Sequence, residues 1–265
     1  MEYLFSQKEK LQDALSNKFI LLFLDYDGTL APITESPDLA TLSKESKDLL
    51  KELSEWPDCS LAIISGRSLN DIKNTVGLKG IIYAGNHGLE VEGSNIKFEN
   101  QISPRLKLII KNIYEEMVEK FSKIKGVLIE NKGLTISVHY RLVAEKDIQG
   151  FLSIFTEITD PHVICDKLRI DSGKKVYEVK PPVKWDKGKV VLWFLARQQF
   201  ISGGKNVLPV YIGDDVTDED AFRALKGKGL TVFVGEPGNS EADYYLKNTE
   251  EVTKFLRLII GLKTS

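Results

Sequence analysis

Uninterrupted apolar runs recur along the chain and predict the strands of a parallel sheet. In the clearest of them, residues 19–24, six apolar residues are followed directly by Asp25. A strand buried on both faces has this pattern, because helices cover both sides of a parallel sheet. Similar runs predict four more strands and one edge strand, at residues 61–64, 80–84, 207–212, 229–234 and, for the edge strand, 243–246.

Segments between these runs have apolar residues at helical spacing and predict helices. The segment from Pro32 to Pro37 is expected to be an irregular loop over the strand ends, because proline disrupts both helices and sheets. Strands that alternate with helices are typical of an α/β fold with a doubly wound, mainly parallel sheet. The predicted helices cover residues 6–17, 43–56, 70–76, 185–200 and 248–260.

The middle of the chain follows a different pattern, with two long amphipathic segments and several short β-rich stretches, as in an α+β module. At 265 residues the chain is long enough for two domains. We expect a core of residues 1–103 and 182–265 and a mobile α+β cap of residues 104–181. Within the cap we expect helices at 105–121 and 146–158, strands at 127–130, 135–140, 162–165, 167–170 and 175–179, and turns at 131–133 and 171–173.

Charge and cysteine content narrow the class of protein. The net charge is −2 and the basic residues are scattered, so no basic field for nucleic acid is expected. The N-terminal residues carry charges throughout, and the longest apolar run, residues 190–196, is too short to span a bilayer. Cys59 and Cys165 fit no metal or redox spacing. We therefore expect a monomeric cytoplasmic protein with free thiols and no nucleic-acid or membrane partner.

Two clusters of acidic residues follow predicted strands. Asp25 and Asp27 stand two residues apart on a turn that contains Gly28. Two carboxylates about 4 Å apart repel by roughly 4 kcal/mol at an effective dielectric near 20. The second cluster, in residues 213–220, has five acids within seven residues. A hard cation such as Mg²⁺ relieves such repulsion, whereas a shared proton, wide separation or a solvated turn would explain the first pair without a metal.

Two further residues are placed where a phosphate could be held. Ser65 ends the second predicted strand, so its hydroxyl and the next helix N-terminus suit a phosphate oxygen, although Ser-Gly is also a common turn. Lys187 stands in the first turn of a predicted helix, where a cation opposes the helix dipole at a small cost. A functional role would explain this placement, but so would an exposed lysine, and Lys189 is a competitor for the role.

The predicted cap strands carry charged residues that suit a sugar phosphate, which needs acceptors for its hydroxyl groups and cations for its phosphate. About half the residues of a strand with one solvated face are polar, so each residue alone is explained equally well by exposure to water. The candidates are Glu130, Lys132, His139, Arg141, Glu178 and Lys180.

Four segments resemble the motifs of the haloacid dehalogenase superfamily, in that family's order: DYDGTL at 25–30, SGR at 65–67, DKG at 186–188 and GDDVTDE at 213–219. The resemblance implies a Rossmann-like core in which Asp25 attacks phosphorus and Asp27 acts as acid and base. It implies that Ser65 and Lys187 contact the phosphate. It also implies a Mg²⁺ site with ligands, direct or through water, from Asp25, Asp27, Asp214, Asp215 and Asp218.

Three other segments resemble the trehalose-6-phosphate phosphatases of that superfamily: GNHGLE at 85–90, HYR at 139–141 and EVKP at 178–181. By this resemblance Arg141 contacts the phosphate, and Arg67 is either another substrate contact or a structural ion-pair partner. His87 and His139 are interpreted as structural. The implied sugar contacts are Glu130, Lys132, Glu178 and Lys180.

The resemblance covers essentially the whole chain, and it implies Mg²⁺-dependent hydrolysis of trehalose 6-phosphate through an aspartyl phosphate. Within the same chemistry, the alternatives are hydrolysis of another sugar phosphate, such as sucrose 6-phosphate or mannosyl-3-phosphoglycerate, or phosphoryl transfer to a sugar. A sugar-phosphate sensor without turnover is an alternative of another class. The presence of both Asp25 and Asp27 argues against it.

Overall fold

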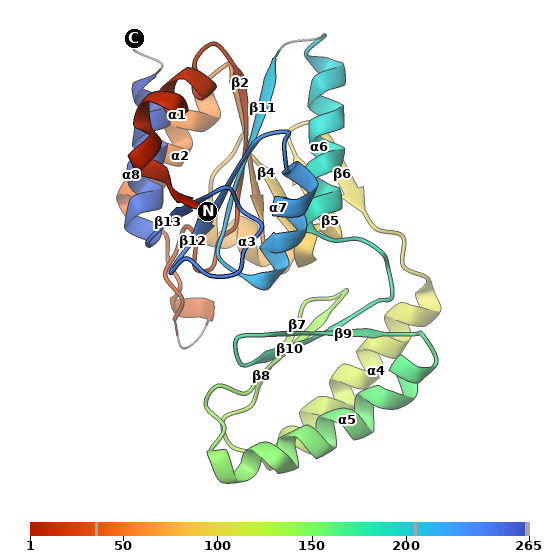
Figure 1. Cartoon of the computed structure of the whole chain (residues 1–265). Coiled ribbons are helices and arrows are strands. Elements are labelled where there is room, and N and C mark those ends of the chain that lie inside the picture. The colour runs from red at the N-terminus through yellow and green to blue at the C-terminus, as the bar shows by residue number, and fades with distance from the viewer. Residues whose placement is uncertain (35–36, 204–205, 263–265) are drawn as a thin grey trace. The chain divides into compact units, whose positions relative to one another are not determined.

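The computed structural model describes residues 1–34, 37–203 and 206–262. The chain divides into two compact units (Figure 1). The first unit comprises residues 1–98 and 185–265, and the second unit comprises residues 99–184. Each has its own sheet and its own hydrophobic core.

The first unit is built on a nine-stranded sheet with β2 (Phe19–Leu24) near its centre, between β11 (Val207–Gly213) and β3 (Cys59–Ile64). These three strands are parallel, which confirms the mainly parallel sheet expected from the sequence. The strand order is β1-β13-β12-β11-β2-β3-β4-β5-β6. The other strands are β1 (Glu2–Tyr3), β4 (Ile82–Gly85), β5 (Glu90–Gly93), β6 (Ile96–Glu99), β12 (Leu230–Val234) and β13 (Tyr244–Leu246).

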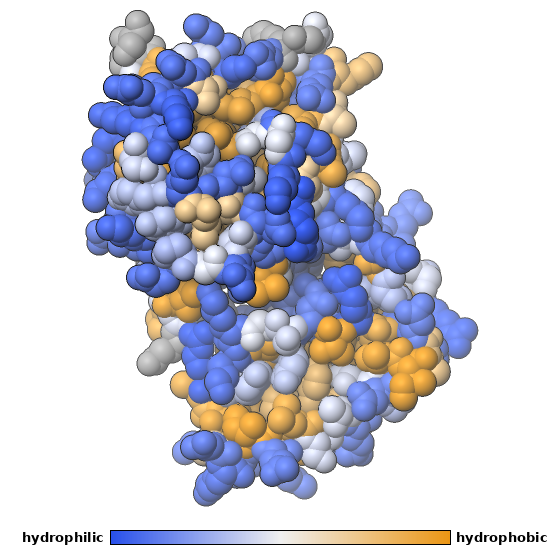
Figure 2. All heavy atoms as spheres, viewed as in Figure 1, coloured by the Kyte–Doolittle hydropathy of each residue, from blue (hydrophilic) through white to orange (hydrophobic). Residues whose placement is uncertain are grey.

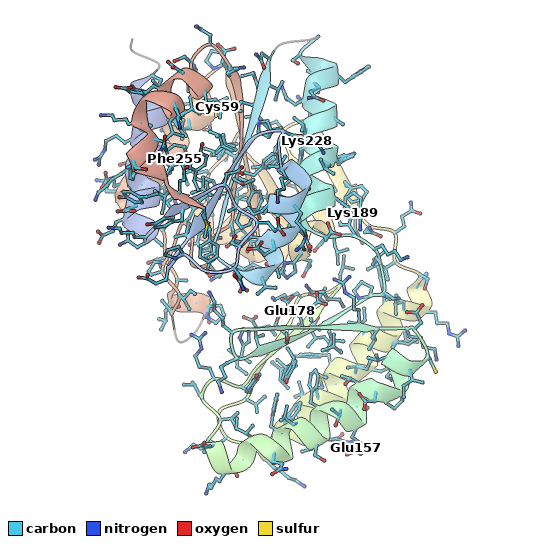
Figure 3. All side chains as sticks on the ribbon, viewed as in Figure 1. Cys59, Glu157, Glu178, Lys189, Lys228 and Phe255 are labelled. Atoms are coloured by element: carbon cyan, nitrogen blue, oxygen red, sulfur yellow. The ribbon has the colours of Figure 1, made fainter. Side chains whose placement is uncertain are left out.

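Helices cover both faces of this sheet, and this explains the uninterrupted apolar runs. Successive side chains of a strand point to opposite faces, so Leu22 and Leu24 of β2 enter one core while Leu21 and Phe23 enter the other. Phe255 of α8 belongs to the first of these cores (Figure 3). Residues of α1 (Lys8–Leu15), α2 (Lys44–Glu55), α3 (Leu69–Val76) and α8 (Thr249–Gly261) line the first core, and residues of α6 (Lys187–Ile201) and α7 (Glu219–Leu225) line the second.

Two predictions for the first unit need correction. The strand at 243–246 is not an edge strand, because β13 lies between β12 and the short N-terminal strand β1. A two-residue strand gives no readable pattern in sequence. The loop expected from Pro32 to Pro37 lacks regular structure at residues 32–34, but Pro37 opens a 3₁₀ turn, η2 (Pro37–Leu39), and residues 35–36 lie outside the described part of the chain.

The second unit packs two helices on one face of a four-stranded antiparallel sheet of order β7-β8-β10-β9. Its core combines aliphatic side chains with a row of aromatic rings, in which Phe151 contacts both Phe121 and Phe155. The elements are α4 (Pro104–Phe121), α5 (Ile148–Ile164), β7 (Leu128–Asn131), β8 (Ile136–His139), β9 (Arg169–Gly173) and β10 (Val176–Lys180).

Two predictions for the second unit are wrong. The strand expected at residues 162–165 does not exist, because α5 continues through Pro161 to Ile164. A proline in the last turn removes only the hydrogen bond to the carbonyl four residues earlier, and Glu157 is exposed on α5 (Figure 3), where water can replace that bond. The turn expected at residues 171–173 is instead the end of β9, and the chain reverses at Lys174 and Lys175, with φ of 67° at Lys175.

Hydrophilic residues cover much of the visible face of the first unit, while orange apolar residues are interspersed over the second (Figure 2). The exposed apolar side chains of the second unit include Leu108, Leu142 and Ile164. No helix in the described ranges combines the length and the apolar content needed to cross a lipid bilayer. Both cysteine thiols are free, with Cys59 buried and Cys165 exposed.

Candidate active site

The carboxyl ends of three adjacent parallel strands bring the predicted catalytic residues of the first unit together. Leu24 lies opposite Ile212 of β11 and Ile63 of β3 in the strand register, so Asp25, Ser65 and Asp214 leave the sheet at the same edge. The backbone N–H of Asp25 still donates to the carbonyl of Ile212. Ligands bind at this edge of open α/β sheets, and the three side chains are buried here.

Lys187 lies at the centre of this cluster. Its ammonium donates to Asp25 Oδ1 and to Asp218 Oδ1, both at 2.7 Å. Burial favours the neutral amine, but the carboxylates of Asp218 and Asp25 raise the pKa of Lys187 well above its ordinary value, so the side chain stays cationic. Lys189 instead pairs with Asp186 in an exposed position (Figure 3), and of the two lysines only Lys187 belongs to the site.

The first turn of α6 determines where Lys187 stands. Asp186 is the N-cap residue, and its carboxylate accepts a hydrogen bond from the backbone N–H of Lys189 at 2.9 Å. The next residue, Gly188, packs against the backbone of Asp220, and any side chain there would collide with it. The helix therefore begins at a fixed point beside the acidic turn.

Asp218 is fully buried and connects several parts of the site. Its Oδ1 accepts from Lys187 and from the hydroxyl of Tyr211, the latter at 2.6 Å. Its Oδ2 accepts from the backbone N–H groups of Asp214, at 3.0 Å, and Asp215, at 2.9 Å. Four donors satisfy this carboxylate, so its geometry favours a positioning role over direct binding of a cation.

The acidic cluster meets the requirements of a hard divalent cation. Oxygens of Asp25, Asp214 and Asp218 lie within 4.8 Å of one another. Burial raises the pKa of Asp25 well above its ordinary value, and the carboxylates of Asp218 and Asp214 raise it further, against the effect of Lys187. Gly28, with φ of 93°, lies so close to Asp214 that a Cβ would collide with its carboxylate. Oxygen ligands of this kind suit Mg²⁺, with Asp25 and Asp214 best placed to hold it.

Asp215 is less central than the sequence implies. It is the N-cap residue of the turn η5 (Val216–Asp218), where its side chain accepts from the backbone N–H of Asp218. In return, the side chain of Asp218 accepts from the backbone N–H of Asp215, and the two hydrogen bonds form a capping box. Asp215 therefore stabilises the acidic turn, and a role at the metal would be indirect.

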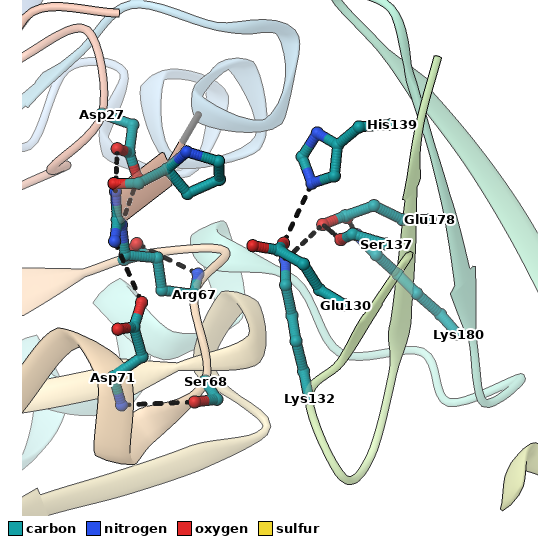
Figure 4. Close-up of polar contacts among 12 residues, drawn as sticks. Asp27, Arg67, Ser68, Asp71, Glu130, Lys132, Ser137, His139, Glu178 and Lys180 are labelled. Carbon is teal, nitrogen blue, oxygen red and sulfur yellow. Dashed lines mark hydrogen bonds and ion pairs between the residues drawn. The ribbon is translucent and has the colours of Figure 1, made fainter. Parts of the chain in front are cut away.

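Asp27 forms a bidentate ion pair with Arg67 (Figure 4). Arg67 Nε donates to Asp27 Oδ2 at 2.8 Å and one terminal nitrogen donates to Oδ1 at 2.7 Å. The same guanidinium donates to Asp71 at 3.0 Å and to the carbonyl of Pro37 at 2.7 Å. Of the two roles left open for Arg67, the structure therefore shows the ion pair. Ser65 lies nearby, with its hydroxyl oxygen accepting from the Arg67 N–H at 3.1 Å.

The predicted sugar contacts of the second unit gather on the sheet face that the helices leave uncovered. Glu130, Ser137 and Glu178 are opposite one another on three neighbouring strands. Lys132 lies 3.4 Å from Glu178, and Lys180 lies 2.6 Å from the other oxygen of that carboxylate (Figure 4). These four predicted sugar contacts, Glu130, Lys132, Glu178 and Lys180, thus form one cluster, the cap cluster.

The remaining candidates lie outside the cap cluster or support it. Arg141 is exposed and donates to the carbonyl of Lys174 at 3.1 Å. His139 contacts Glu130 at 2.9 Å, which fits its structural interpretation. His87 has a left-handed backbone, with φ of 56°, in the turn η3 (Asn86–Gly88) of the first unit. Sequence reasoning did not single out Tyr211, because within an apolar strand it reads as a core residue.

Comparison with known proteins identifies the family. A family model described as trehalose-phosphatase matches residues 23–249. The chain belongs to the trehalose-phosphatase family. It is 37% identical over 267 residues to the probable trehalose-phosphate phosphatase D of Arabidopsis thaliana, covering 96% of this chain and 71% of the relative. It is 35% identical over 268 residues to trehalose-phosphate phosphatase B of the same plant, with 96% and 70% covered.

Solved structures show the same fold. The C-terminal domain of the trehalose-6-phosphate phosphatase of C. albicans superposes with a TM-score of 0.82 at 24% identity, covering 98% of this chain and 99% of that one. A trehalose-6-phosphate phosphatase related protein gives a TM-score of 0.76 at 27% identity, with 92% and 100% covered. Membership of this family implies a divalent metal, and the buried carboxylates of Asp25, Asp214 and Asp218 form a cluster that could hold one.

Proposed function

We propose that this chain is a Mg²⁺-dependent phosphatase that hydrolyses trehalose 6-phosphate to trehalose and phosphate. The observation that carries the proposal is the buried contact between Asp25 and Lys187 beside Asp214, at the carboxyl edge of the sheet. A carboxylate held next to an ammonium and a second carboxylate is suited to attack a phosphate that arrives with a cation. The names of the relatives support the choice of substrate.

The residues present can carry out both halves of the reaction. A carboxylate oxygen of Asp25 attacks phosphorus and forms an aspartyl phosphate, while the sugar oxygen leaves with a proton from Asp27. Asp27 then takes a proton from the water that attacks the aspartyl phosphate, which releases phosphate and restores Asp25. When bound at Asp25 and Asp214, with the backbone carbonyl of Asp27, Mg²⁺ supplies positive charge that offsets the charge of the phosphoryl oxygens.

Two side chains complete the phosphate site. An ammonium has three N–H donors, so the contacts of Lys187 with Asp25 and Asp218 leave one for a phosphate oxygen. The hydroxyl oxygen of Ser65 accepts from the backbone of Arg67, and its own O–H can be donated to the substrate. Asp215 and Asp218 act in this scheme by holding the turn and Lys187.

The second unit is proposed to be the cap that selects the sugar. The cap cluster offers carboxylates and ammonium groups on one sheet face, the mixture that the hydroxyl groups of a disaccharide require. Arg141 remains the proposed phosphate contact from this unit. Closure of such a cap would exclude water from the aspartyl phosphate, and its opening would release trehalose. The monomeric state and the cytoplasmic location expected from the sequence stay predictions.

A substrate panel tests the proposal. Phosphate release would be measured from trehalose 6-phosphate, glucose 6-phosphate, sucrose 6-phosphate and mannosyl-3-phosphoglycerate, with Mg²⁺ or EDTA. We expect a strong, Mg²⁺-dependent preference for trehalose 6-phosphate that Asp25→Asn abolishes and Asp13→Asn, an exposed change on α1, leaves intact. Preference for another ester would overturn the substrate, and tight binding without turnover would show a sensor.

A further inference from the structure

A buried tyrosine, Tyr211, is hydrogen-bonded to Asp218, the carboxylate that also pairs with Lys187 of the proposed site. Tyr211 stands on β11 and is fully buried in the second core of the first unit. Its ring lies edge-on to Phe222, with centroids 5.7 Å apart, and 6.4 Å from the ring of Phe23. Burial and these ring contacts restrict the movement of the ring and therefore of its hydroxyl group.

That hydroxyl shares an acceptor with the proposed phosphate-binding lysine. Tyr211 donates to Asp218 Oδ1 at 2.6 Å, and Lys187 donates to the same oxygen at 2.7 Å. The other oxygen of Asp218 is held by two backbone N–H groups. Without the phenol, Oδ1 would have the ammonium as its remaining donor, and a buried carboxylate with fewer donors attracts that ammonium more strongly.

The consequence reaches the nucleophile, because Lys187 divides its contacts between two carboxylates. One is Asp218 and the other is Asp25, each at 2.7 Å. A shift of the ammonium toward Asp218 would lengthen its contact with Asp25. Such a shift would misplace both the attacking oxygen and the charge that the phosphoryl group needs.

We propose that Tyr211 is a positioning residue for phosphoryl transfer, acting through Asp218 on Lys187 and thereby on Asp25. This inference rests on the proposed reaction at Asp25 but not on the identity of the sugar. Tyr211 itself touches neither Asp25 nor the phosphate in this scheme. Its loss should therefore lower kcat and leave KM nearly unchanged.

Tyr211→Phe removes the hydroxyl and keeps the packed ring. Hydrogen bonds to charged groups are among the stronger ones, so we expect kcat to fall roughly 10- to 100-fold with KM within about twofold of wild type. The matched control is Tyr83→Phe. Tyr83 is buried on β4, and its hydroxyl donates to the carbonyl of Leu78 at 2.8 Å. Both variants should lose thermal stability, whereas only Tyr211→Phe should lose kcat.

Each alternative result has a defined meaning. Equal kcat values for wild type and Tyr211→Phe, an equal loss in both variants, or a rise in KM alone would each overturn the positioning role. If Tyr211→Phe does not fold, 3-fluorotyrosine at position 211 keeps the ring and the hydroxyl but alters its donor strength. It should then change kcat more than the same replacement at position 83, and unchanged kcat would again overturn the role.

Two substrates keep this test separate from the test of function. The variants would be assayed with trehalose 6-phosphate and with para-nitrophenyl phosphate. A wild type active only on the second ester would overturn the proposed sugar, and the comparison of Tyr211→Phe with Tyr83→Phe would still decide the role of Tyr211. A wild type inactive on both esters would overturn the phosphatase and the positioning role together.

Discussion

At the scale of single residues, Arg67 is the side chain whose contacts most constrain the proposed chemistry. Its guanidinium donates hydrogen bonds to both carboxylate oxygens of Asp27. Further N–H groups of the guanidinium donate to Asp71 and to the carbonyl of Pro37. Arg67 is 5% exposed, and its guanidinium lies over the ring of Tyr26, at 5.1 Å from the centroid. These contacts favour a role for Arg67 in holding Asp27, the proposed acid and base, over a role as a substrate contact.

Arg67→Lys tests this interpretation. Lysine keeps the positive charge but cannot form two parallel hydrogen bonds to one carboxylate. Losing one charge-assisted bond should lower kcat roughly 10-fold and leave KM nearly unchanged. Steady-state kinetics on trehalose 6-phosphate would check this, with the exposed Arg223→Lys as the control. A higher KM at unchanged kcat would instead make Arg67 a substrate ligand.

The sequence predicts which residues lie together at the candidate site, but it does not predict how they contact one another. Asp25, Asp214 and Ser65 could be located because each follows an apolar strand, and the strand register then brings them to one edge. The role of Asp218 could not be read in this way. Its four donors come from strand β11, from the acidic turn and from α6, and only the folded chain brings them together.

At the scale of elements, the start of α6 is the feature on which the site depends most. Helix capping fixes where a helix begins, and here the N-cap Asp186 immediately precedes Lys187. The sequence placed this helix at 185–200, and the structure has it at Lys187–Ile201. The predicted element boundaries are wrong where proline or turn residues in the sequence are compatible with more than one structure. The helix predicted at 146–158 in fact continues through Pro161 to Ile164, and the turn predicted at 171–173 is strand.

Asp186→Ala should weaken this helix start. Loss of an N-cap side chain costs about 1 kcal/mol of stability, and fraying of the first turn would loosen Lys187, so we also expect a lower kcat. Ser103→Ala is the matched control, because Ser103 caps α4 of the second unit in the same manner. Denaturant unfolding and kinetics would be measured for both. Similar losses of kcat in the two variants would contradict a specific role for the α6 cap.

At the scale of the whole molecule, the division into two units follows from a change of pattern along the chain. The central strands β2, β3 and β11 of the first unit are almost wholly apolar, because helices cover both faces of its sheet. Strands of the second unit alternate, because its helices cover one face and leave Glu130, Ser137 and Glu178 on the other. These two patterns of apolar and polar residues can be distinguished in the sequence. It cannot indicate which charged residues on the open face pair with one another.

The acidic cluster lies in the first unit, so a bound metal should stabilise that unit. Asp25, Asp214 and Asp218 with Lys187 amount to three carboxylates against one ammonium, and a divalent cation would neutralise the excess. A ligand that binds only the folded state at 100 times its Kd adds about 2.7 kcal/mol of stability. Mg²⁺ should therefore raise the Tm relative to EDTA, and Asp214→Asn should remove most of that rise.

Hydrogen exchange can locate this effect within the chain. In the absence of substrate, Mg²⁺ should slow exchange at the amides of β2, β11 and the first turn of α6, which surround the acidic cluster. The amides of β7 to β10 should exchange as before, because the cap cluster already pairs its carboxylates with lysines. Uniform protection of both units, or none, would show that the cation does not bind at Asp25 and Asp214.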